Sequence, residues 1–410
     1  MPEFFKVVTP DEVFEALSGF NRLAVEIVPL DAALGRVSGA DIASPEDLPP
    51  LPRSTMDGYA VIAADTFGAS DSIPAFLDVA STVSMGKLSG ITLGRNQAVA
   101  IPTGGFLPHG ADAVVMVEYT SATGEGAIEV SRPVTIGENV LGKAEDVAIG
   151  KIVIPAGKRL LPQDIGLLAG LGILQISVYR RPKAAIISTG DEIVPVTADP
   201  PPGRIRDINS HSIAALVRAS GGEAERFAIV PDDPALLRSA IEKALASADV
   251  VVLSGGSSVG ERDHMVSVVA ALPGAVVHAH GIAIRPGKPT LIASVGGRPV
   301  FGLPGHPVSA LVVAQVFLAP FIRYLGGEKL KHGSAGARVR AALAVSVRSA
   351  QGREEYVRVK LEDNQGRLSA RPVFGKSGML STLVNADGFF VVPIHAEGIP
   401  AGEMVDVILF

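Results

Sequence analysis

The stretch DVVVLSGGSSVGERDH, residues 249–264, decides the fold because it joins a buried strand to a glycine-rich loop. The apolar run Val250–Leu253 is short enough for a strand that is covered on both faces. A loop with three glycines and three serines follows it. Open α/β sheets bind ligands at the carboxyl ends of such strands. Glycines let the backbone approach a ligand, and free N–H groups with hydroxyls suit an oxyanion.

Strand and helix patterns alternate on both sides of this stretch. Short apolar runs predict strands at 184–187, 227–230, 275–277, 290–293 and 299–302, and capped amphipathic segments predict helices at 209–219 and 234–247. This alternation predicts a parallel, doubly wound sheet over roughly residues 180–325. The apolar segment at about 308–322 is too short to span a bilayer and therefore predicts a buried helix.

The rest of the chain shows other secondary-structure patterns. A helix is expected after Thr9, which is a good N-cap, and the proline-dense segment Pro45–Pro52 predicts an extended crossing between domains. Short apolar runs between glycine turns over 54–140 predict a β-rich domain. Period-two alternation over 337–410, with a turn at 364–366, predicts a second one. The expected fold class is a multidomain α/β protein.

Composition excludes several classes of protein. The chain has 410 residues, a formal net charge of −6 and no cysteine, which excludes disulfides, thiolate catalysis and zinc–sulfur sites. We expect no nucleic-acid partner because no basic stripe is visible. We also expect no membrane partner, because the amino terminus lacks the pattern of a signal peptide. A cytoplasmic location fits these features.

Polar motifs follow the predicted strands. They are STGDE (188–192), RIRDINS (204–210), the serine–glycine loop, IRPGKP (284–289) and GLPGHP (302–307). Each motif alone also fits a plain turn or a helix cap. Together they would gather carboxylates and cations along one edge of the sheet, an arrangement that suits Mg²⁺ and phosphates. The charged members are Asp191, Glu192, Asp207, Asp263, Arg206, Arg285 and Lys288.

Other catalytic motifs fit less well. The chain contains no G-x-x-x-x-G-K-[ST], no G-x-G-x-x-G after a strand and no H-E-x-x-H. Residues 256–260 match the G-x-S-x-G of hydrolases, and Asp263 with His280 or His306 could complete a triad around Ser258. Asp263 is only five residues past Ser258, however, where that motif requires its helix. This alternative is therefore disfavoured.

Seven motifs in order resemble one known family. They are STMDGYAV (54–61), PTGGFLPHGADAVVMVE (102–118), STGDEI (188–193), RDIN (206–209), VLSGGSSVGERD (252–263), RPGKPT (285–290) and GLPGHPVSA (302–310). Together they resemble the MoeA-type molybdopterin molybdenumtransferases, the family of the gephyrin E-domain. The likeness runs from about Pro45 to the carboxyl terminus. It implies insertion of molybdate into adenylylated molybdopterin, with Mg²⁺ present and release of AMP.

The resemblance also implies an elongated homodimer of four-part chains. An elongated linking domain would comprise residues 1–45 with 141–179, and a β-rich domain residues 46–140. The doubly wound, molybdopterin-binding α/β domain would span 180–327, and a carboxyl-terminal β domain 328–410. The resemblance implies that the substrate-binding cleft is similar to one that forms between the α/β domain of one subunit and the β-rich domain of the partner subunit. The resemblance further allows contacts with a molybdopterin adenylyltransferase and with molybdoenzymes.

Functional roles carry over motif by motif. The resemblance implies catalytic carboxylates at Asp57, Asp146, Glu192, Asp232 and Asp263, of which Glu192 and Asp263 would hold the metal. It implies substrate binding by the serine–glycine loop, and by cations, hydroxyls and prolines around it. These residues are Thr103, Arg206, Asp207, Gly255, Gly256, Ser257, Ser258, Arg285, Lys288, Pro304, Pro307 and Ser377.

Three positions depart from common family forms. Arg285 stands where many members have lysine, His306 where many have asparagine, and many have lysine near His280. Arginine changes the geometry of anion binding, and a histidine can make it pH-dependent. A paralogue that inserts tungstate therefore stays open as an alternative. A non-catalytic molybdopterin-binding scaffold is a second alternative, against which the retained Asp57, Glu192 and Asp263 argue.

Overall fold

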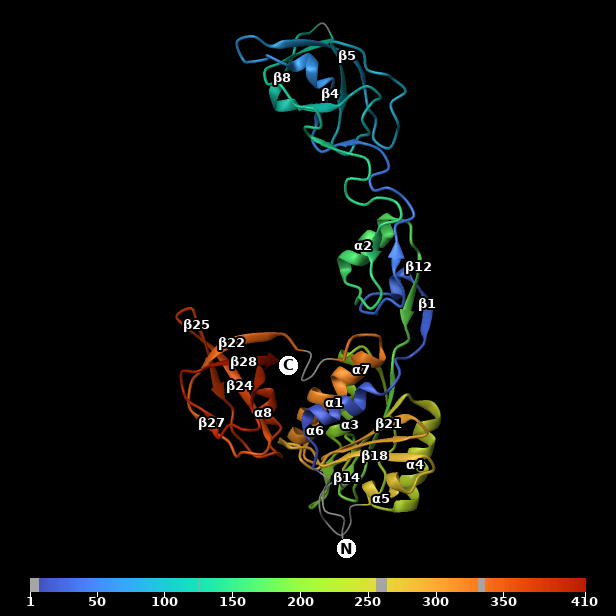
Figure 1. Ribbon diagram of the computed structural model, residues 1–410, viewed down its shortest axis with the longest axis vertical. Coiled ribbons are helices and arrows are strands. Elements are labelled where there is room, and N and C mark those ends of the chain that lie inside the picture. The colour runs from blue at the N-terminus through green and yellow to red at the C-terminus, as the bar shows by residue number, and fades with distance from the viewer. Residues whose placement is uncertain (1–6, 125, 256–263, 331–335) are drawn as a thin grey trace. The chain divides into compact units, whose positions relative to one another are not determined.

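The computed structural model describes residues 7–124, 126–255, 264–330 and 336–410 (Figure 1). The chain forms two compact units. The first comprises Met1–Gly39, Gly157–Leu161 and Gln175–Phe410, and the second comprises Ala40–Ala156 and Pro162–Leu174. The described residues form three six-stranded sheets, two in the first unit and one in the second.

The α/β sheet of the first unit has the strand order β16-β13-β17-β21-β20-β18. Its strands are β16 (Glu223–Arg226), β13 (Lys183–Ser188), β17 (Val250–Ser254), β21 (Arg298–Leu303), β20 (Leu291–Val295) and β18 (Ala275–His280). The first four run parallel, and the register pairs Ser188 with Ser254 and Ser254 with Leu303. The carboxyl ends of β13, β17 and β21 therefore lie level with one another.

The sheet is mixed, whereas the sequence predicted parallel strands throughout. β20 runs antiparallel to β21, and β18 runs antiparallel to β20. The reason is the connection between β20 and β21, which is a two-residue turn at Gly296 and Gly297, both with positive φ. So short a turn joins only antiparallel strands, and glycine adopts the required backbone readily.

Both faces of this sheet are covered by helices. Ala184 and Ile186 pack in one core cluster with α1 (Pro10–Ser18), α3 (Asn209–Ala219) and α6 (Pro307–Val313). Ala185 and Ile187 point the other way, toward α4 (Pro234–Ser247) and α5 (Met265–Ala270). Figure 1 shows the two groups of helices on opposite sides of the strands. Burial of both faces explains why the central strands read as continuous apolar runs.

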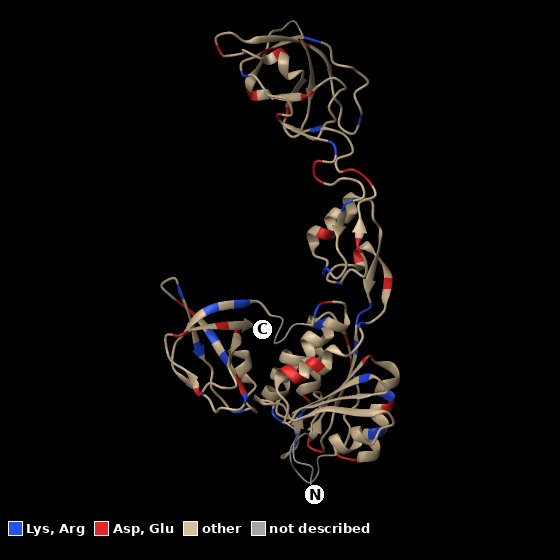
Figure 2. Cartoon of the chain, viewed as in Figure 1, with Lys and Arg blue, Asp and Glu red and all other residues tan. Residues whose placement is uncertain are grey.

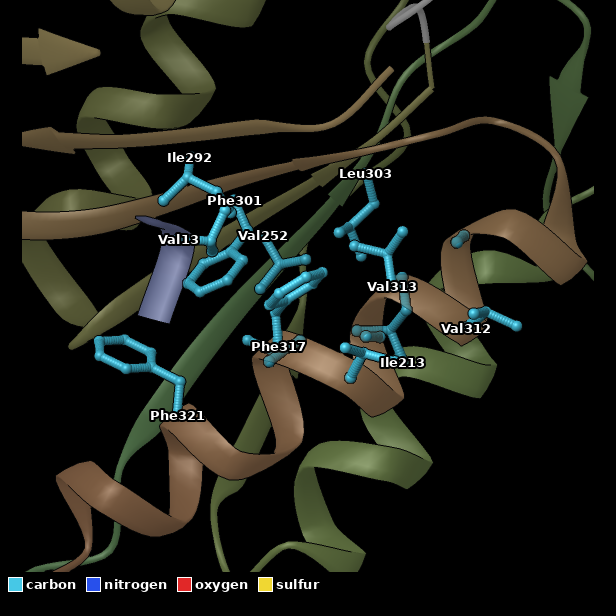
Figure 3. Packing of buried hydrophobic residues seen from close by; sticks show 14 of the residues in the cluster. Val13, Ile213, Val252, Ile292, Phe301, Leu303, Val312, Val313, Phe317 and Phe321 are labelled. Carbon is cyan, nitrogen blue, oxygen red and sulfur yellow. The ribbon is translucent and has the colours of Figure 1, made fainter. Parts of the chain in front are cut away.

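The apolar segment predicted at about 308–322 is a buried core helix. It consists of α6, a π-helical turn (Ala314–Leu318) and α7 (Ala319–Leu325). Its 19 residues are long enough to cross a membrane, contrary to the expected length, but 78% of its apolar window is buried inside the protein. Phe317 and Phe321 project from it among Val252 and Phe301 of the sheet (Figure 3).

The predicted cap at Thr9 is present as a capping box at the start of α1. The Thr9 hydroxyl accepts a bond from Glu12 N at 3.3 Å, and the Glu12 carboxylate accepts one from Thr9 N at 2.6 Å. Thr9→Ala should therefore lower the free energy of unfolding by about 1 kcal/mol. Urea denaturation measures this loss, and Thr9→Ser is the matched control. Equal midpoints for Thr9→Ala and the wild type would contradict the assigned role of the cap.

One predicted strand is displaced along the chain. The sequence placed it at 227–230, but β16 occupies the polar segment Glu223–Arg226. β16 lies at the edge of the sheet and pairs only with β13, so polar side chains are tolerated there. The apolar Phe227 and Val230 come after the strand and pack against the core beside α4.

The carboxyl-terminal sheet has the order β19-β24-β25-β22-β28-β26. Its strands are β19 (Ile284–Arg285), β24 (Glu354–Asn364), β25 (Arg367–Pro372), β22 (Arg338–Leu343), β28 (Met404–Leu409) and β26 (Gly388–Val392). The predicted alternation at 356–361 lies within β24, and the predicted turn connects β24 to β25. Tyr356 and Phe389 join the core cluster that contains α6, so this sheet packs against the α/β domain. A short antiparallel ribbon of β1 (Val25–Pro29) and β12 (Gln175–Tyr179) also belongs to the first unit.

The second unit is rich in β-strands. Its sheet has the order β7-β4-β6-β5-β9-β8. The strands are β4 (Gly58–Val61), β5 (Ala75–Thr82), β6 (Gln97–Ile101), β7 (Ala113–Met116), β8 (Thr120–Ala122) and β9 (Ala127–Val130). Two small pairs, β3 (Arg53–Ser54) with β10 (Val140–Leu141) and β2 (Ile42–Ala43) with β11 (Ile152–Ile154), and helix α2 (Pro162–Gly170) belong to the same unit. Both units carry charges of both signs (Figure 2).

Candidate functional site

The level ends of β13, β17 and β21 bring three of the predicted motif loops together. Thr189 N donates to Ser254 O at 2.9 Å, and Gly255 N lies 3.4 Å from Leu303 O. Gly255 has a φ of 136°, and a Cβ there would stand 2.2 Å from Thr189 O, so only glycine fits. Gly256, Ser257, Ser258 and Asp263, the rest of the predicted loop, lie outside the described residues.

Asp207 fixes the start of α3 to the end of β13. One carboxylate oxygen accepts from Ser188 Oγ at 2.9 Å and from Ser210 N at 3.1 Å. The other accepts from Ser210 Oγ at 2.5 Å. The side chain is buried and both of its oxygens are used, as in a helix-capping carboxylate. These contacts make Asp207 a positioning residue for the predicted substrate edge.

Asn209 connects three elements at the same edge, although it was not among the predicted ligand residues. Its amide nitrogen donates to Ser254 Oγ and to Gly305 O, both at 2.8 Å. Its amide oxygen is buried and has no hydrogen-bond partner among the described residues. Since a buried acceptor without a partner costs free energy, this oxygen is a group that a bound ligand could satisfy. In the sequence, the feature that pointed to Asn209 was its place as the last residue of the RDIN motif (206–209).

Predicted carboxylates line the β13 side of the edge. Asp191 and Glu192 follow β13, and Asp232 N donates to Asp191 Oδ1 at 3.2 Å, so the STGDE and PDD segments meet. All three side chains are exposed. In the described part of the chain, no group of three or more His, Cys, Asp or Glu side chains is arranged to hold a metal ion. One or two carboxylates with substrate phosphates suffice for Mg²⁺, so exposed Glu192 and Asp191 fit that cation chemically.

A wide pocket opens beside these carboxylates. It contains about 1510 Å³ of empty space and is lined by Asp191, Asp207, His211 and Arg226, among others. Arg226 Nη1 lies 2.6 Å from His211 Nε2. The predicted ligand residue Arg206 instead bonds within its own loop, to Ala198 O and Asp199 Oδ1, each at 3.0 Å. The pocket is large enough for a nucleotide-sized ligand.

The β21 side of the edge is basic and hydroxyl-bearing. Pro304 is buried, Pro307 begins α6, and His306 Nδ1 lies 3.2 Å from Ser377 Oγ. Val308 N donates to Ser377 O at 3.1 Å, so the GKSG loop of the carboxyl-terminal domain rests on the start of α6. The structure thus brings together Pro307 and Ser377, two predicted ligand residues that are far apart in sequence.

Arg285 and Lys288 are both exposed on the turn that connects β18 to β20. Arg285 pairs with Glu355 at 3.6 Å, where β19 lies beside β24. The buried Gly287 between them packs against Val313 of α6. This packing holds the turn against the helix whose first residues meet Ser377.

Arg358 is a candidate site residue that the sequence did not reveal. It lies on β24, is 8% exposed, and donates to Gly375 O through Nη2 at 3.3 Å. Its Nε is buried and has no partner within the described segments, and burial lowers the pKa of the guanidinium. A buried, poorly bonded cation next to the loop that carries Ser377 suits an anion. In the sequence Arg358 looks like any outward residue of an alternating strand.

In the second unit, two predicted residues contact each other. Antiparallel pairing of β4 with β6 places Asp57, before β4, next to Thr103, after β6. Thr103 donates to Asp57 Oδ1 from its N–H at 2.7 Å and from its hydroxyl at 2.9 Å. These two bonds lower the pKa of Asp57, the backbone bond contributing most. Asp146 is exposed on a different loop of this unit and bonds through its backbone N–H to Leu48 O at 3.2 Å.

Comparison with known proteins gives matches along nearly the whole chain. Residues 8–172 match the MoeA N-terminal region (domains I and II), 185–324 a probable molybdopterin binding domain, and 340–410 the MoeA C-terminal region (domain IV). A molybdopterin molybdenumtransferase of Nostoc sp. is 37% identical over 388 residues, 93% of this chain and 88% of the relative. The enzyme of that name in Bacillus subtilis is 31% identical over 404 residues, covering 97% and 93%.

A solved structure agrees with these sequence matches. The molybdopterin biosynthesis MoeA protein of Pyrococcus horikoshii is 38% identical, and the alignment covers 98% of this chain and 99% of that one. The two folds superpose with a TM-score of 0.82. The likeness therefore extends to the arrangement of sheets and helices described above.

Proposed function

The chain belongs to the MoeA family of molybdopterin molybdenumtransferases, and we propose that it inserts molybdate into adenylylated molybdopterin and releases AMP. The observation that carries this proposal is the chemistry of the strand-end edge. Carboxylates follow β13, cations and hydroxyls gather around the start of α6, and Asn209 joins the two sides. Such an edge can bind a substrate whose phosphates coordinate a divalent cation. It can also hold an oxyanion next to that substrate.

On the acidic side, we propose that Glu192, with Asp263 of the serine–glycine loop, holds Mg²⁺. When bound, this ion would neutralise charge on the substrate phosphates while the phosphoanhydride is cleaved. Asp232 is proposed as a further catalytic carboxylate, since its segment contacts that of Asp191. The adjoining pocket at Arg226 and His211 offers room for the adenylyl group.

On the basic side, we propose that Lys288, Arg285 and Arg358 bind the molybdate. Ser377 and His306 can donate hydrogen bonds to its oxygens, and Pro304 with Pro307 shapes the wall. The unpartnered Nε of buried Arg358 supports this assignment, because a bound anion would give it an acceptor. Asn209 would position the pterin end of the substrate through its free amide oxygen.

The remaining parts of the proposal rest on the family resemblance. We propose a cytoplasmic homodimer in which Asp57 and Thr103 are supplied by the β-rich domain and Asp146 by the linking domain. The charged state of Asp57, which Thr103 stabilises with two bonds, supports a role next to a cation or a polar substrate group. An adenylyltransferase is the proposed source of the substrate, and a molybdoenzyme the proposed recipient of the product. Light scattering coupled to size exclusion tests the dimer.

The decisive experiment combines the purified full chain with adenylylated molybdopterin, Mg²⁺ and molybdate and follows the release of AMP. We expect AMP release to require molybdate, and the product to activate a cofactor-free molybdoenzyme. Binding of the pterin without AMP release would instead identify a scaffold. Repeating the assay with tungstate tests which oxyanion the departures at Arg285 and His306 favour.

Glu192→Gln should increase the Mg²⁺ concentration for half-maximal AMP release about tenfold, because a neutral amide binds this cation poorly. The exposed side chain makes few contacts, so the melting temperature should stay close to that of the wild type. Glu225→Gln, on the exposed edge strand β16, is the matched control and should leave the Mg²⁺ dependence unchanged. An unaltered Mg²⁺ dependence in Glu192→Gln would remove this residue from the metal site.

A further inference from the structure

A second charged pocket lies at the other end of the parallel strands, where β13 begins rather than where it ends. Its walls come from the chain before β13, the end of α3 at Ser220 and Gly221, and the end of α7. It is small, with a cavity volume of about 20 Å³. It adjoins a wider depression that shares Arg36, Arg180 and Arg181 and is also lined by acidic side chains. We call it the arginine pocket. No step of the proposed reaction uses it.

The lining of the arginine pocket is strongly basic. Five guanidinium groups line the pocket, and three of them pair with described carboxylates, those of Glu26, Asp249 and Glu328. The arginines are Arg36, Arg159, Arg180, Arg181 and Arg323. So many cations around one small pocket favour an anionic ligand, and planar guanidinium groups match the oxygens of a tetrahedral oxyanion well.

Several of these arginines are held in place by other groups. Arg159 Nε donates to Glu328 at 2.9 Å, and Arg180 makes two bonds to Asp249 at 2.6 and 3.0 Å. Arg36 forms an ion pair with Glu26 and donates to Tyr179 O at 2.8 Å. Arg181, by contrast, is exposed and forms no ion pair with any described residue. The pocket therefore combines a fixed basic frame with one cation that is available to a ligand.

Ser220 provides the independent observation that points to a ligand. It is 2% exposed, it lines the pocket, and its hydroxyl has no hydrogen-bond partner in the part of the chain that the structure describes. Arginines near the ends of α3 and α7 could be explained by the negative ends of the two helix dipoles. That explanation leaves the hydroxyl unsatisfied, whereas an anion would accept its proton. Gly221 leaves room, since a Cβ there would lie 3.1 Å from an Arg159 nitrogen.

We propose that the arginine pocket binds a small tetrahedral oxyanion, with Ser220 and Arg181 as its ligands and Arg159 and Arg180 as the surrounding frame. Inorganic phosphate, sulfate and molybdate share this chemistry. The bound anion connects the segment before β13 to the ends of α3 and α7. It therefore stabilises the folded first unit in proportion to its concentration.

The test measures anion binding in the full chain with Lys288→Ala as background, which removes a cation of the proposed catalytic site. Isothermal titration with phosphate should show a binding site that persists in this background. Adding Arg181→Ala should raise the Kd about tenfold or more, whereas Arg348→Ala, which removes another exposed arginine, should not change it. Loss of all binding in Lys288→Ala alone, or equal effects of the two arginine variants, would overturn the proposal.

Ser220→Ala gives a readout that a structural role would not produce. Without added anion its melting temperature should equal or exceed that of the wild type, because the variant removes a buried hydroxyl without a partner. With phosphate its thermal stabilisation should be several-fold smaller than that of the wild type. An unchanged response to phosphate would exclude Ser220 as a ligand and overturn the proposal. Parallel titrations with sulfate and molybdate identify which oxyanion the pocket prefers.

Discussion

Arg358→Met is expected to raise the KM for molybdate about 100-fold, because a charge-assisted hydrogen bond to the oxyanion is lost. The fold should survive the change. Methionine has a similar length, and the guanidinium it replaces is buried with one bond to the described residues, at Gly375 O. Replacing a buried charge by an apolar side chain of similar volume is often neutral or stabilising. AMP release measured against molybdate concentration gives the KM, and thermal unfolding reports on the fold.

The control for this variant is Arg353→Met. Arg353 directly precedes β24, the strand that carries Arg358, and is more accessible than Arg358. It should leave the KM within about twofold of the wild type, as expected for a charge outside the site. If Arg358→Met also kept the wild-type KM, the buried arginine would serve only to support the loop at Gly375. A fall in melting temperature without a change in KM would lead to the same conclusion.

Local patterns predicted most of the elements that build the fold. The helices at 209–219 and 234–247 and the strand at 250–253 are present because caps and apolar period depend on neighbouring residues only. The displaced strand β16 and the antiparallel β20 depend on something else. An edge strand is selected by its partner β13, and strand direction is set by the turn at Gly296 and Gly297. Neither choice is encoded in hydrophobic period alone.

The candidate site shows the same division. Asp57 and Thr103 were predicted through their motifs, and the pairing of β4 with β6 brings them into contact. Asn209 and Arg358 gain their roles from groups far away in sequence, Gly305 and Gly375 respectively. Their burial follows from packing of separate segments, which no short motif reports. Unsatisfied buried polar atoms, visible only in three dimensions, are the signal that identifies both residues.

Asp57→Asn should lower the turnover number for AMP release by about 10²- to 10⁴-fold if the carboxylate acts on the reaction as proposed. Stability should change little, since Asp57 is exposed and Asn can still accept a bond from Thr103 N. Asp65→Asn is not a suitable control, because Asp65 forms an ion pair with Arg95. Asp71→Asn, an exposed acid in the same unit, is suitable and should leave turnover unchanged. Wild-type turnover in Asp57→Asn would remove this carboxylate from the mechanism.

The pH dependence separates the charge of Asp57 from its position. Because Thr103 lowers the pKa of Asp57 below 3.8, the carboxylate stays ionised at all pH values above its ordinary range. Any contribution of this group to activity or stability is therefore present above pH 3.8 and is lost as the pH falls through the lowered folded-state pKa. Thr103→Val keeps the backbone bond, which is the larger cause, but removes the hydroxyl bond. In this variant the pKa of Asp57, followed by carboxyl NMR, should rise toward 3.8. Turnover near neutral pH should fall about tenfold at most, because the carboxylate remains charged. A loss in Thr103→Val as large as that in Asp57→Asn would show that the hydroxyl itself, rather than the charge it stabilises, is required.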